Sequence, residues 1–254
     1  MLAGVRHVAD CVLQLLWPPT CAGCGTQEHE DHGFCPTCSG ALLALTALPY
    51  CPRCGATTGL GVEVGEAGCG ACPRVMFRFA RLVRLAPFAG PVRSGVHAAK
   101  YRRGGDAGGR LGRLLAEAAA ARLAEMELDV VLPVPMHWLR RLQRGRDHSV
   151  ELARPVARRL GLPVGDELVR VRNTPPQVGL PASRRAGNVR GAFEARHRRG
   201  LSGARVLLVD DVMTTGSTMN EAARTLLEAG AERVVAAVIA RAEPPSAYSE
   251  ALRR

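Results

Sequence analysis

One segment near the carboxyl end constrains this 254-residue chain more than any other. Residues 206–209 (VLLV) form an apolar run with the length and composition of a buried parallel strand. Two acidic residues, Asp210 and Asp211, follow this run, and small residues then lead into a helical pattern over 220–229 that Gly230 ends. Ligands of open α/β sheets bind at the carboxyl ends of strands. The segment therefore predicts an α/β fold with a ligand site at this strand end.

The residues around the acidic pair suit a sugar phosphate. Backbone N–H groups and hydroxyls at a helix start favour a phosphate, and two adjacent carboxylates suit a pair of sugar hydroxyls. We therefore expect Asp210 and Asp211 to bind the 2′ and 3′ hydroxyls of a ribose 5-phosphate. The expected phosphate-binding residues are Thr214, Thr215, Gly216, Ser217 and Thr218. The alternative is an ordinary strand-to-helix turn whose acidic pair caps a neighbouring group.

The order of these residues resembles the PRPP-binding motif of the type I phosphoribosyltransferases. That motif has four apolar residues, two acids, a hydrophobic pair and T-T-G-[ST]-T, and residues 206–218 match it throughout. The resemblance makes Asp210 and Asp211 the candidate catalytic residues.

The charge of the chain is strongly positive and is carried mostly by arginine. The formal net charge is +11, and Lys100 is the only lysine of the sequence. Arginines concentrate at 140–146 and at 184–199. Such clusters attract the phosphates of a nucleotide-like substrate or of a nucleic acid. The alternative is a solvated basic face without a ligand.

The apolar stretch over 5–16 is too short to cross a bilayer, which takes about 20 apolar residues. It carries charged residues and lacks a small-residue cleavage site, so we expect a leading helix rather than a signal peptide. The expected location is therefore cytoplasmic.

Eight of the nine cysteines form four C-x-x-C pairs. Two such pairs close a tetrahedral four-thiolate zinc site, and Gly25 and Gly55 follow two of the pairs, where a tight turn favours glycine. Disulfides or an iron–sulfur cluster are the alternatives, but the first needs an oxidising compartment and the second usually groups three cysteines. We expect two structural zinc ions, one bound by Cys21, Cys24, Cys35 and Cys38, the other by Cys51, Cys54, Cys69 and Cys72.

Strand and helix patterns alternate through the rest of the chain, which predicts a parallel, doubly wound sheet. A half-exposed strand is expected over 76–87, because apolar and basic residues alternate there. The other expected strands are 129–134, 168–170 and 234–240, and the expected helices include the first part of 90–103, 110–126 and 149–160.

At this level the whole chain resembles the ComF family, in which a cysteine-rich ribbon domain precedes a phosphoribosyltransferase-like domain. Besides the Asp210 segment, three blocks carry the resemblance: 100–105 (KYRRGG), 134–145 with its arginines, and 176–193. The chain departs from the family pattern at Asp147-His148, where an asparagine–glutamine pair is usual. The expected parts are a leading amphipathic helix (1–19), a double zinc ribbon (20–75), a phosphoribosyltransferase-like domain (76–242) and a tail (243–254).

The ComF resemblance implies PRPP with magnesium as ligand, and a link to natural DNA uptake, in which single-stranded DNA and competence helicase or processing proteins are partners. It places pyrophosphate beside Val134, Pro135 and Met136, with Arg141 or Arg144. Lys100 and Arg102 are expected on a loop that closes over the site, or else Lys100 is simply solvated. His137 and His148 are candidate general bases by residue type alone.

Two functions follow from this resemblance. One is transfer of ribose 5-phosphate from PRPP to an unknown acceptor. The other is a non-catalytic, single-stranded-DNA-binding competence factor with a PRPP-sensing site.

Overall fold

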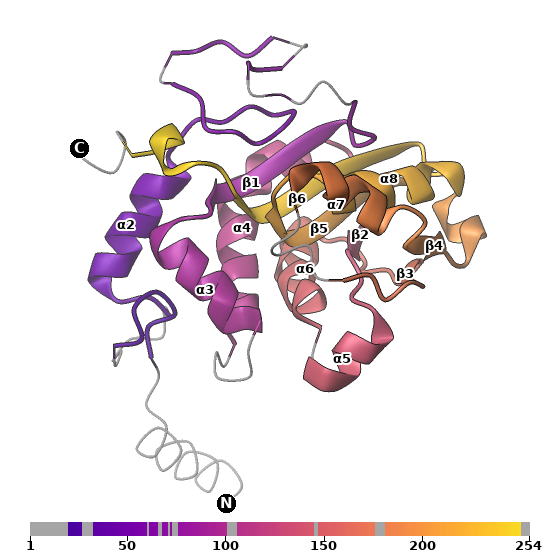
Figure 1. Cartoon of the computed structure of the whole chain (residues 1–254), viewed down its shortest axis with the longest axis horizontal. Coiled ribbons are helices and arrows are strands. Elements are labelled where there is room, and N and C mark those ends of the chain that lie inside the picture. The colour runs from indigo at the N-terminus through magenta and orange to yellow at the C-terminus, as the bar shows by residue number, and fades with distance from the viewer. Residues whose placement is uncertain are drawn as a thin grey trace, which may run out of the picture.

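The centre of the protein is a four-stranded parallel sheet with the strand order β1-β6-β5-β2 (Figure 1). The computed structural model describes residues 20–26, 33–59, 61–65, 68–70, 72, 76–100, 106–144, 147–175 and 181–249. The strands are β1 (Arg81–Pro87), β2 (Val130–Pro133), β5 (Arg205–Met213) and β6 (Arg233–Arg241). They are rich in valine, leucine and alanine, as expected of parallel strands covered on both faces. The predicted α/β fold with a parallel sheet is confirmed.

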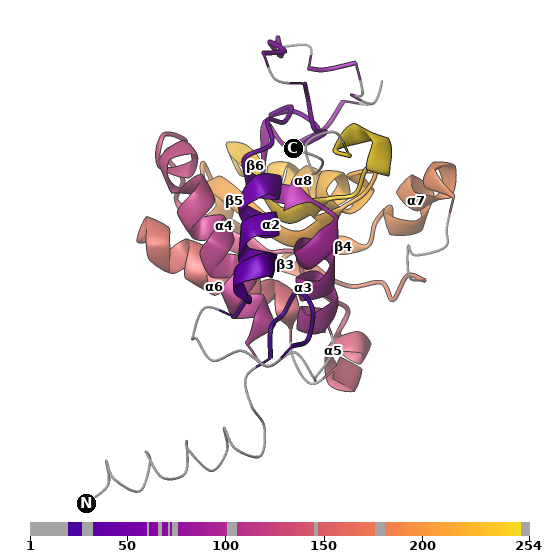
Figure 2. The same ribbon diagram turned by 90° about the vertical axis from the view of Figure 1, so that its left-hand side faces the viewer.

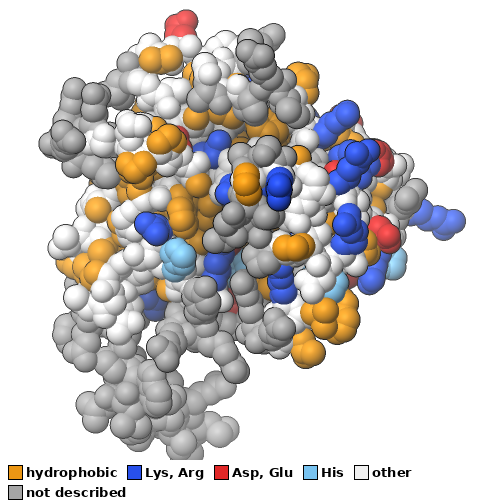
Figure 3. All heavy atoms as spheres, viewed as in Figure 1, with side chains coloured by type: hydrophobic (Ala, Val, Ile, Leu, Met, Phe, Trp, Pro, Cys, Tyr) orange, Lys and Arg blue, Asp and Glu red, His pale blue; other side chains and the backbone are white. Residues whose placement is uncertain are grey.

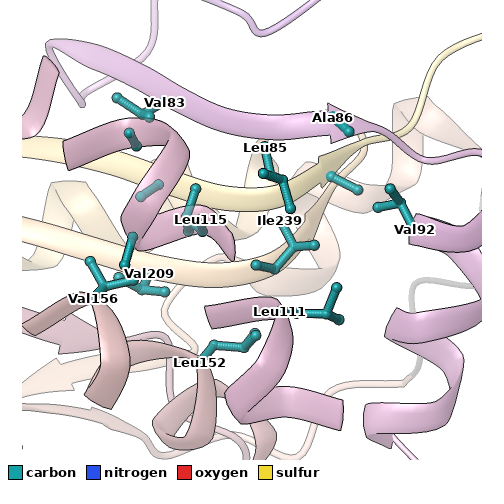
Figure 4. Packing of buried hydrophobic residues seen from close by; sticks show 14 of the residues in the cluster. Val83, Leu85, Ala86, Val92, Leu111, Leu115, Leu152, Val156, Val209 and Ile239 are labelled. Atoms are coloured by element: carbon teal, nitrogen blue, oxygen red, sulfur yellow. The ribbon is translucent and has the colours of Figure 1, made fainter. Parts of the chain in front are cut away.

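Two apolar cores lie on opposite faces of this sheet, because successive strand residues point to opposite sides. Leu207 belongs to one core and the next residue, Leu208, to the other. Figure 4 shows the first core, where helices pack against β1, β5 and β6. The helices on this face are α3 (Gly90–Lys100), α4 (Ala107–Ala124) and α6 (His148–Leu160), and those on the other are α7 (Ala182–Val189) and α8 (Ser217–Glu228).

Smaller elements extend this three-layer body. The short strands β3 (Leu168–Arg170) and β4 (Phe193–Ala195) form a separate antiparallel pair, of which only β3 was predicted. The remaining elements are α2 (Pro36–Thr46), α5 (Trp138–Arg144) and two 3₁₀ turns, η2 (Arg198–Leu201) and η3 (Pro245–Ala247). In the part of the chain described here, no helix is both long enough and apolar enough to span a bilayer.

The strand predicted as half-exposed over 76–87 is shorter and nearly all buried. β1 begins at Arg81, and the other six of its seven residues are buried. Arg84 tolerates burial because its guanidinium forms an ion pair with Glu243 at 3.0 Å, with side chains 0% and 5% exposed. The alternating basic residues therefore did not mark a solvent face, since one of them has a buried partner.

The segment that carries the acidic pair also differs from expectation. β5 does not end at Val209 but continues through the acids, because its pairing with β6 extends to Met213 opposite Arg241. α8 begins at Ser217, three residues before the predicted helical pattern. The loop between strand and helix is therefore only Thr214 to Gly216.

The two cysteine-rich segments lie on either side of α2 in the sequence and contact different parts of the body. The first, residues 20–26 and 33–38, runs into the first turn of α2; the second includes the described loops within 50–72, which lie at the end of the molecule opposite α5 (Figures 1 and 2). The predicted tail does not begin as a loose segment, because Glu243 is held by Arg84 and by the backbone N–H of Thr57. The leading helix predicted over 1–19 lies outside the described residues.

Candidate phosphate-binding and metal sites

The loop between β5 and α8 has the geometry of an anion-binding turn. Gly216 precedes the helix with a φ of +80°, and a Cβ on it would lie 2.7 Å from the ring of Phe77. Glycine is therefore required both by backbone conformation and by space. The hydroxyls of Thr215 and Ser217 lie 2.9 Å apart at the first turn of α8. A helix start lined by hydroxyls is suited to a phosphate.

The two acids differ in their surroundings, although the sequence treats them as one clamp. Asp211 is 8% exposed, and its Oδ2 lies 2.9 Å from both Lys100 Nζ and His148 Nε2. Asp210 is partly buried, and its Oδ1 accepts a hydrogen bond from the backbone N–H of Asp211 at 2.9 Å. One carboxylate thus pairs with the Lys100 ammonium and the His148 imidazole, whereas the other accepts from a backbone N–H.

These surroundings move the two pKa values in opposite directions. Burial, followed by the charge on Asp211, raises the pKa of Asp210 to about 7. Burial alone would also raise the pKa of Asp211, but His148 and Lys100 outweigh it and hold that pKa well below its usual range. The two carboxylates of the pair therefore differ in acidity, with the pKa of Asp210 above and that of Asp211 below the usual range.

Lys100 and His148 reach Asp211 from two helices on the same face of the sheet. Lys100 is the last residue of α3. Because its Nζ pairs with Asp211, its side chain is not simply solvated. His148 is the first residue of α6, whose start is capped by Asp147 through a 3.2 Å hydrogen bond from Ser149 N. The sequence analysis identified neither the capping role of Asp147 nor the partner of His148; an aspartate directly before a helical pattern is the local signal for the cap. Arg102 lies outside the described residues.

The predicted pyrophosphate loop lies at the same edge of the sheet as the acids. β2 pairs with β5 in register from Val130 to Pro133 opposite Val209, and Val134 N donates to Val209 O at 2.8 Å. Pro135 and Met136 continue this loop into α5. Arg141 lies exposed on α5, and Arg144 is its last residue, with a side chain outside the described part.

Two further residues complete the description of this region: His137, a candidate general base, and Arg170, to which the sequence assigned no role. His137 is buried, and its Nδ1 accepts a hydrogen bond from Leu139 N at 3.3 Å, which is a structural contact. Arg170 on β3 is a further cation near Asp210 that no sequence signal marked. Burial and then Arg140 lower the pKa of Arg170, and the charge of Asp210 opposes that shift.

The eight cysteines form two four-thiolate clusters in the predicted combinations. Sulfur pairs from different C-x-x-C motifs lie 3.6–3.7 Å apart, from Cys24 to Cys35, Cys51 to Cys72 and Cys54 to Cys69. A tetrahedral zinc with bonds of about 2.3 Å places its sulfurs roughly 3.8 Å apart. All eight thiols are free of disulfides. The clusters therefore fit two structural zinc sites.

Local turns support both clusters. Gly25 and Gly55 have φ values of +77° and +72°, as the predicted turns require. Each glycine N–H donates to the carbonyl of the first cysteine of its pair at 2.8 Å. These sequence signals were correct because they depend on residues close together in the chain.

Comparison with known proteins agrees with this architecture. The family described as "Phosphoribosyl transferase domain" matches residues 146–250, and "Double zinc ribbon domain" matches residues 12–74. Competence protein F of Haemophilus influenzae is 31% identical over 81% of this chain and 90% of its own. DNA utilization protein YhgH of Escherichia coli O6:H1 is 35% identical over 80% of this chain and 87% of its own.

A solved structure of glutamine PRPP amidotransferase from B. subtilis covers 59% of this chain and 27% of its own, with 25% identity and a TM-score of 0.36. The curated relatives, by contrast, are 31% and 35% identical over about four-fifths of this chain. The chain therefore belongs to the ComF family, with a double zinc ribbon followed by a phosphoribosyltransferase domain.

Proposed function

We propose that this protein binds PRPP with magnesium at the edge formed by β2, β5 and α8, and transfers its ribose 5-phosphate to an acceptor. The observation that carries the proposal is the hydroxyl-lined turn of Thr214 to Ser217, which begins three residues after the second of two unlike carboxylates. The 5-phosphate binds at this turn, Thr218 included, because the helix start attracts an anion. The match of residues 146–250 to the phosphoribosyl transferase domain family supports the same assignment.

The two acids share the ribose and the metal. Asp211, held ionised by Lys100 and His148, accepts from the ribose hydroxyls, while Asp210 provides an oxygen ligand once its proton leaves. Magnesium prefers oxygen ligands and bridges phosphates, so the donor set fits it; when bound it neutralises the departing pyrophosphate. Val134, Pro135 and Met136 lie on the pyrophosphate side, and Arg141 and Arg144 supply positive charge there.

Calorimetric titration with PRPP and magnesium tests this proposal. Asp210→Asn with Asp211→Asn should abolish binding, because amides keep the shape but remove the charges that hold the diol and the metal. Glu228→Gln, at an exposed position on α8, serves as the matched control and should bind as the wild type does. Unchanged affinity in the double variant would exclude the ribose assignment. Pyrophosphate release is then screened with bases and amines as acceptors.

The second candidate function is binding of single-stranded DNA without turnover. It is favoured by one surface: Trp138 and Leu142 on α5 are 63% and 76% exposed, with the exposed Arg141 between them. Figure 3 shows hydrophobic side chains gathered over α5. Single-strand binders combine aromatic stacking with positive charge. The names of two relatives, a competence protein and a DNA utilization protein, agree with a role in DNA handling.

Salt-dependent binding separates the two functions. DNA affinity should fall steeply as the salt concentration rises. The slope of log affinity against log salt concentration should become smaller when four arginines are replaced with glutamine, because fewer counterions are then released. These arginines are Arg140, Arg141, Arg144 and Arg146. Trp138→Ala should weaken DNA binding about tenfold without changing PRPP affinity. DNA binding that persists at saturating PRPP and magnesium would show that the two ligands use different surfaces. The cytoplasmic location and the competence helicase or processing partners stay predictions.

A further inference from the structure

The second zinc cluster lies at one end of a short chain of contacts that reaches the phosphate-binding turn. Its knuckle residue Cys54 belongs to a small buried cluster with Cys51 and Ala56. The carbonyl oxygen of Cys54 accepts a hydrogen bond from Arg241 Nε at 2.9 Å. Arg241 is the last residue of β6, so this contact joins the ribbon to the central sheet.

The same guanidinium also reaches the strand that carries the acids. Arg241 Nη1 donates to the carbonyl of Met213 at 3.3 Å, and the next residue, Ala242, donates its backbone N–H to that carbonyl at 2.9 Å. Met213 is the last residue of β5 and directly precedes Thr214. Arg241 therefore bridges two carbonyls, one on a zinc knuckle and one at the start of the turn. The fork of an arginine suits such a bridge, because its donors are held in one plane.

A second contact runs beside the first. Phe77 packs against the buried cysteine cluster of the second ribbon. Its ring also occupies the space beside Gly216, where a Cβ would approach it to 2.7 Å. The ring stacks on Phe79, with centroids 4.6 Å apart, which fixes its position. The zinc cluster is thus linked through Arg241 to the residue that precedes the turn, and through Phe77 to the glycine of the turn.

We propose that Arg241 is a positioning residue through which the zinc of the second ribbon orders the phosphate-binding turn, with Phe77 as a parallel contact. Metal at Cys51, Cys54, Cys69 and Cys72 holds the knuckle backbone, the knuckle carbonyl holds Arg241, and Arg241 holds Met213. Loss of this zinc loosens Thr214 to Thr218, whereas loss of the first zinc does not. The proposal rests on the proposed function only in taking this turn as the phosphate-binding element.

Hydrogen exchange of the backbone amides of 214–218 tests the coupling without any ligand. Cys69→Ser, which removes a ligand of the second site, should leave one zinc per chain and speed exchange in the turn about tenfold. Cys24→Ser removes a ligand of the first site and is the matched control, because its exchange in the turn should stay as in the wild type. Equal exchange in Cys69→Ser and wild type would overturn the proposal.

Arg241 itself is tested in variants that keep all eight cysteines. Arg241→Met should retain both zinc ions, yet speed exchange in the turn as much as Cys69→Ser does. Arg241→Lys should restore part of the protection, since an ammonium can reach one carbonyl but not both in a fork. The combination of Cys69→Ser with Arg241→Met should add nothing, because both act on one path. Fully additive effects, or normal exchange in Arg241→Met, would overturn the proposal.

A ligand measurement separates this inference from the proposed function. PRPP affinity with magnesium should fall about tenfold in Arg241→Met, or about 1.4 kcal/mol. Thr57→Val removes the hydroxyl that donates to Glu243 and accepts from Arg84, which are other contacts beside the same ribbon, and should leave PRPP affinity unchanged. If the wild type binds no PRPP, the proposed function fails, and hydrogen exchange still decides whether the second zinc orders the turn.

Discussion

The two zinc ribbons have the same ligand chemistry but contact the rest of the protein differently. The first shares the main apolar core: Cys21 and Phe34 pack in one cluster with Leu45 of α2 and with α3 and α4. The second has its own small cluster and is joined to the sheet mainly by polar contacts of Arg84, Arg241 and Glu243. Similar cysteine spacing therefore does not imply a similar role. Apolar contacts stabilise the fold without a preferred direction, whereas hydrogen bonds are directional and can also position the groups of a site.

The largest difference should follow loss of one zinc from each ribbon. Cys21→Ser removes a ligand that is itself part of the main core, so the free energy of unfolding should fall by about 4 kcal/mol or more. Cys69→Ser should cost clearly less, because its cluster is separate from that core. Zinc content and thermal unfolding of both variants measure the difference. An equal fall in the free energy of unfolding in both variants would contradict the difference in how the two ribbons contact the rest of the protein.

Truncation of α2 tests the apolar attachment alone. Leu45 is 1% exposed in the core shared with the first ribbon, so Leu45→Ala should cost about 3 kcal/mol through lost burial and a cavity. Leu43 on the same helix is 71% exposed, and Leu43→Ala should stay within about 0.5 kcal/mol of the wild type. Denaturant unfolding measures both. A similar cost for the two leucines would contradict the packing of α2 on the core.

The polar contacts of the second ribbon should contribute somewhat less to the free energy of unfolding than the apolar packing of Leu45 does. Glu243→Gln keeps an acceptor for Arg84 but leaves a buried cation without its counter-charge, so we expect a loss of about 2 kcal/mol. Glu228→Gln breaks an exposed pair with Arg224, where the Glu228 side chain is 62% exposed, and should cost about 0.5 kcal/mol or less. Urea unfolding of the two glutamine variants gives the comparison. If Glu243→Gln lowers the free energy of unfolding as little as Glu228→Gln does, the buried Arg84–Glu243 pair does not stabilise the protein.

The smallest effect is expected at Asp210, which provides a reference outside both ribbons. Its pKa is raised from 3.8 to about 7, so the folded state binds more protons than the unfolded state between these values, and stability falls as pH rises through that window. A shift of this size corresponds to at most about 4 kcal/mol. Because Asp210 is partly exposed and solvent screens its charge, Asp210→Asn should stabilise the protein at pH 8 by on the order of 1 kcal/mol, and the gain should vanish as pH falls toward 4. Unfolding measured at both pH values checks the sign. A loss of stability at pH 8 would show that ionised Asp210 is well solvated.

Much of the site could be predicted because its signals are local. The turn of Thr214 to Ser217 and the order of strand, acids and helix depend on adjacent residues, and the structure retains that order. The start of α6 was misplaced by one residue and that of α8 by three, since helix ends depend on caps such as Gly216 rather than on periodicity alone. The predicted half-exposure of β1 was wrong. A basic residue in a strand is either solvated or paired with a buried acid, and the sequence does not distinguish these two cases.

The two cysteine clusters, the parallel sheet and the turn after the acids were predictable from the sequence, because each depends on spacing along the chain. The surroundings of these elements depend on the tertiary fold. Lys100 and His148 meet at Asp211 from separate helices, Arg84 meets Glu243 across 159 residues, and Arg241 meets Cys54 across 187. Such contacts depend on the order and register of the strands, which bring distant segments together and which no local pattern encodes.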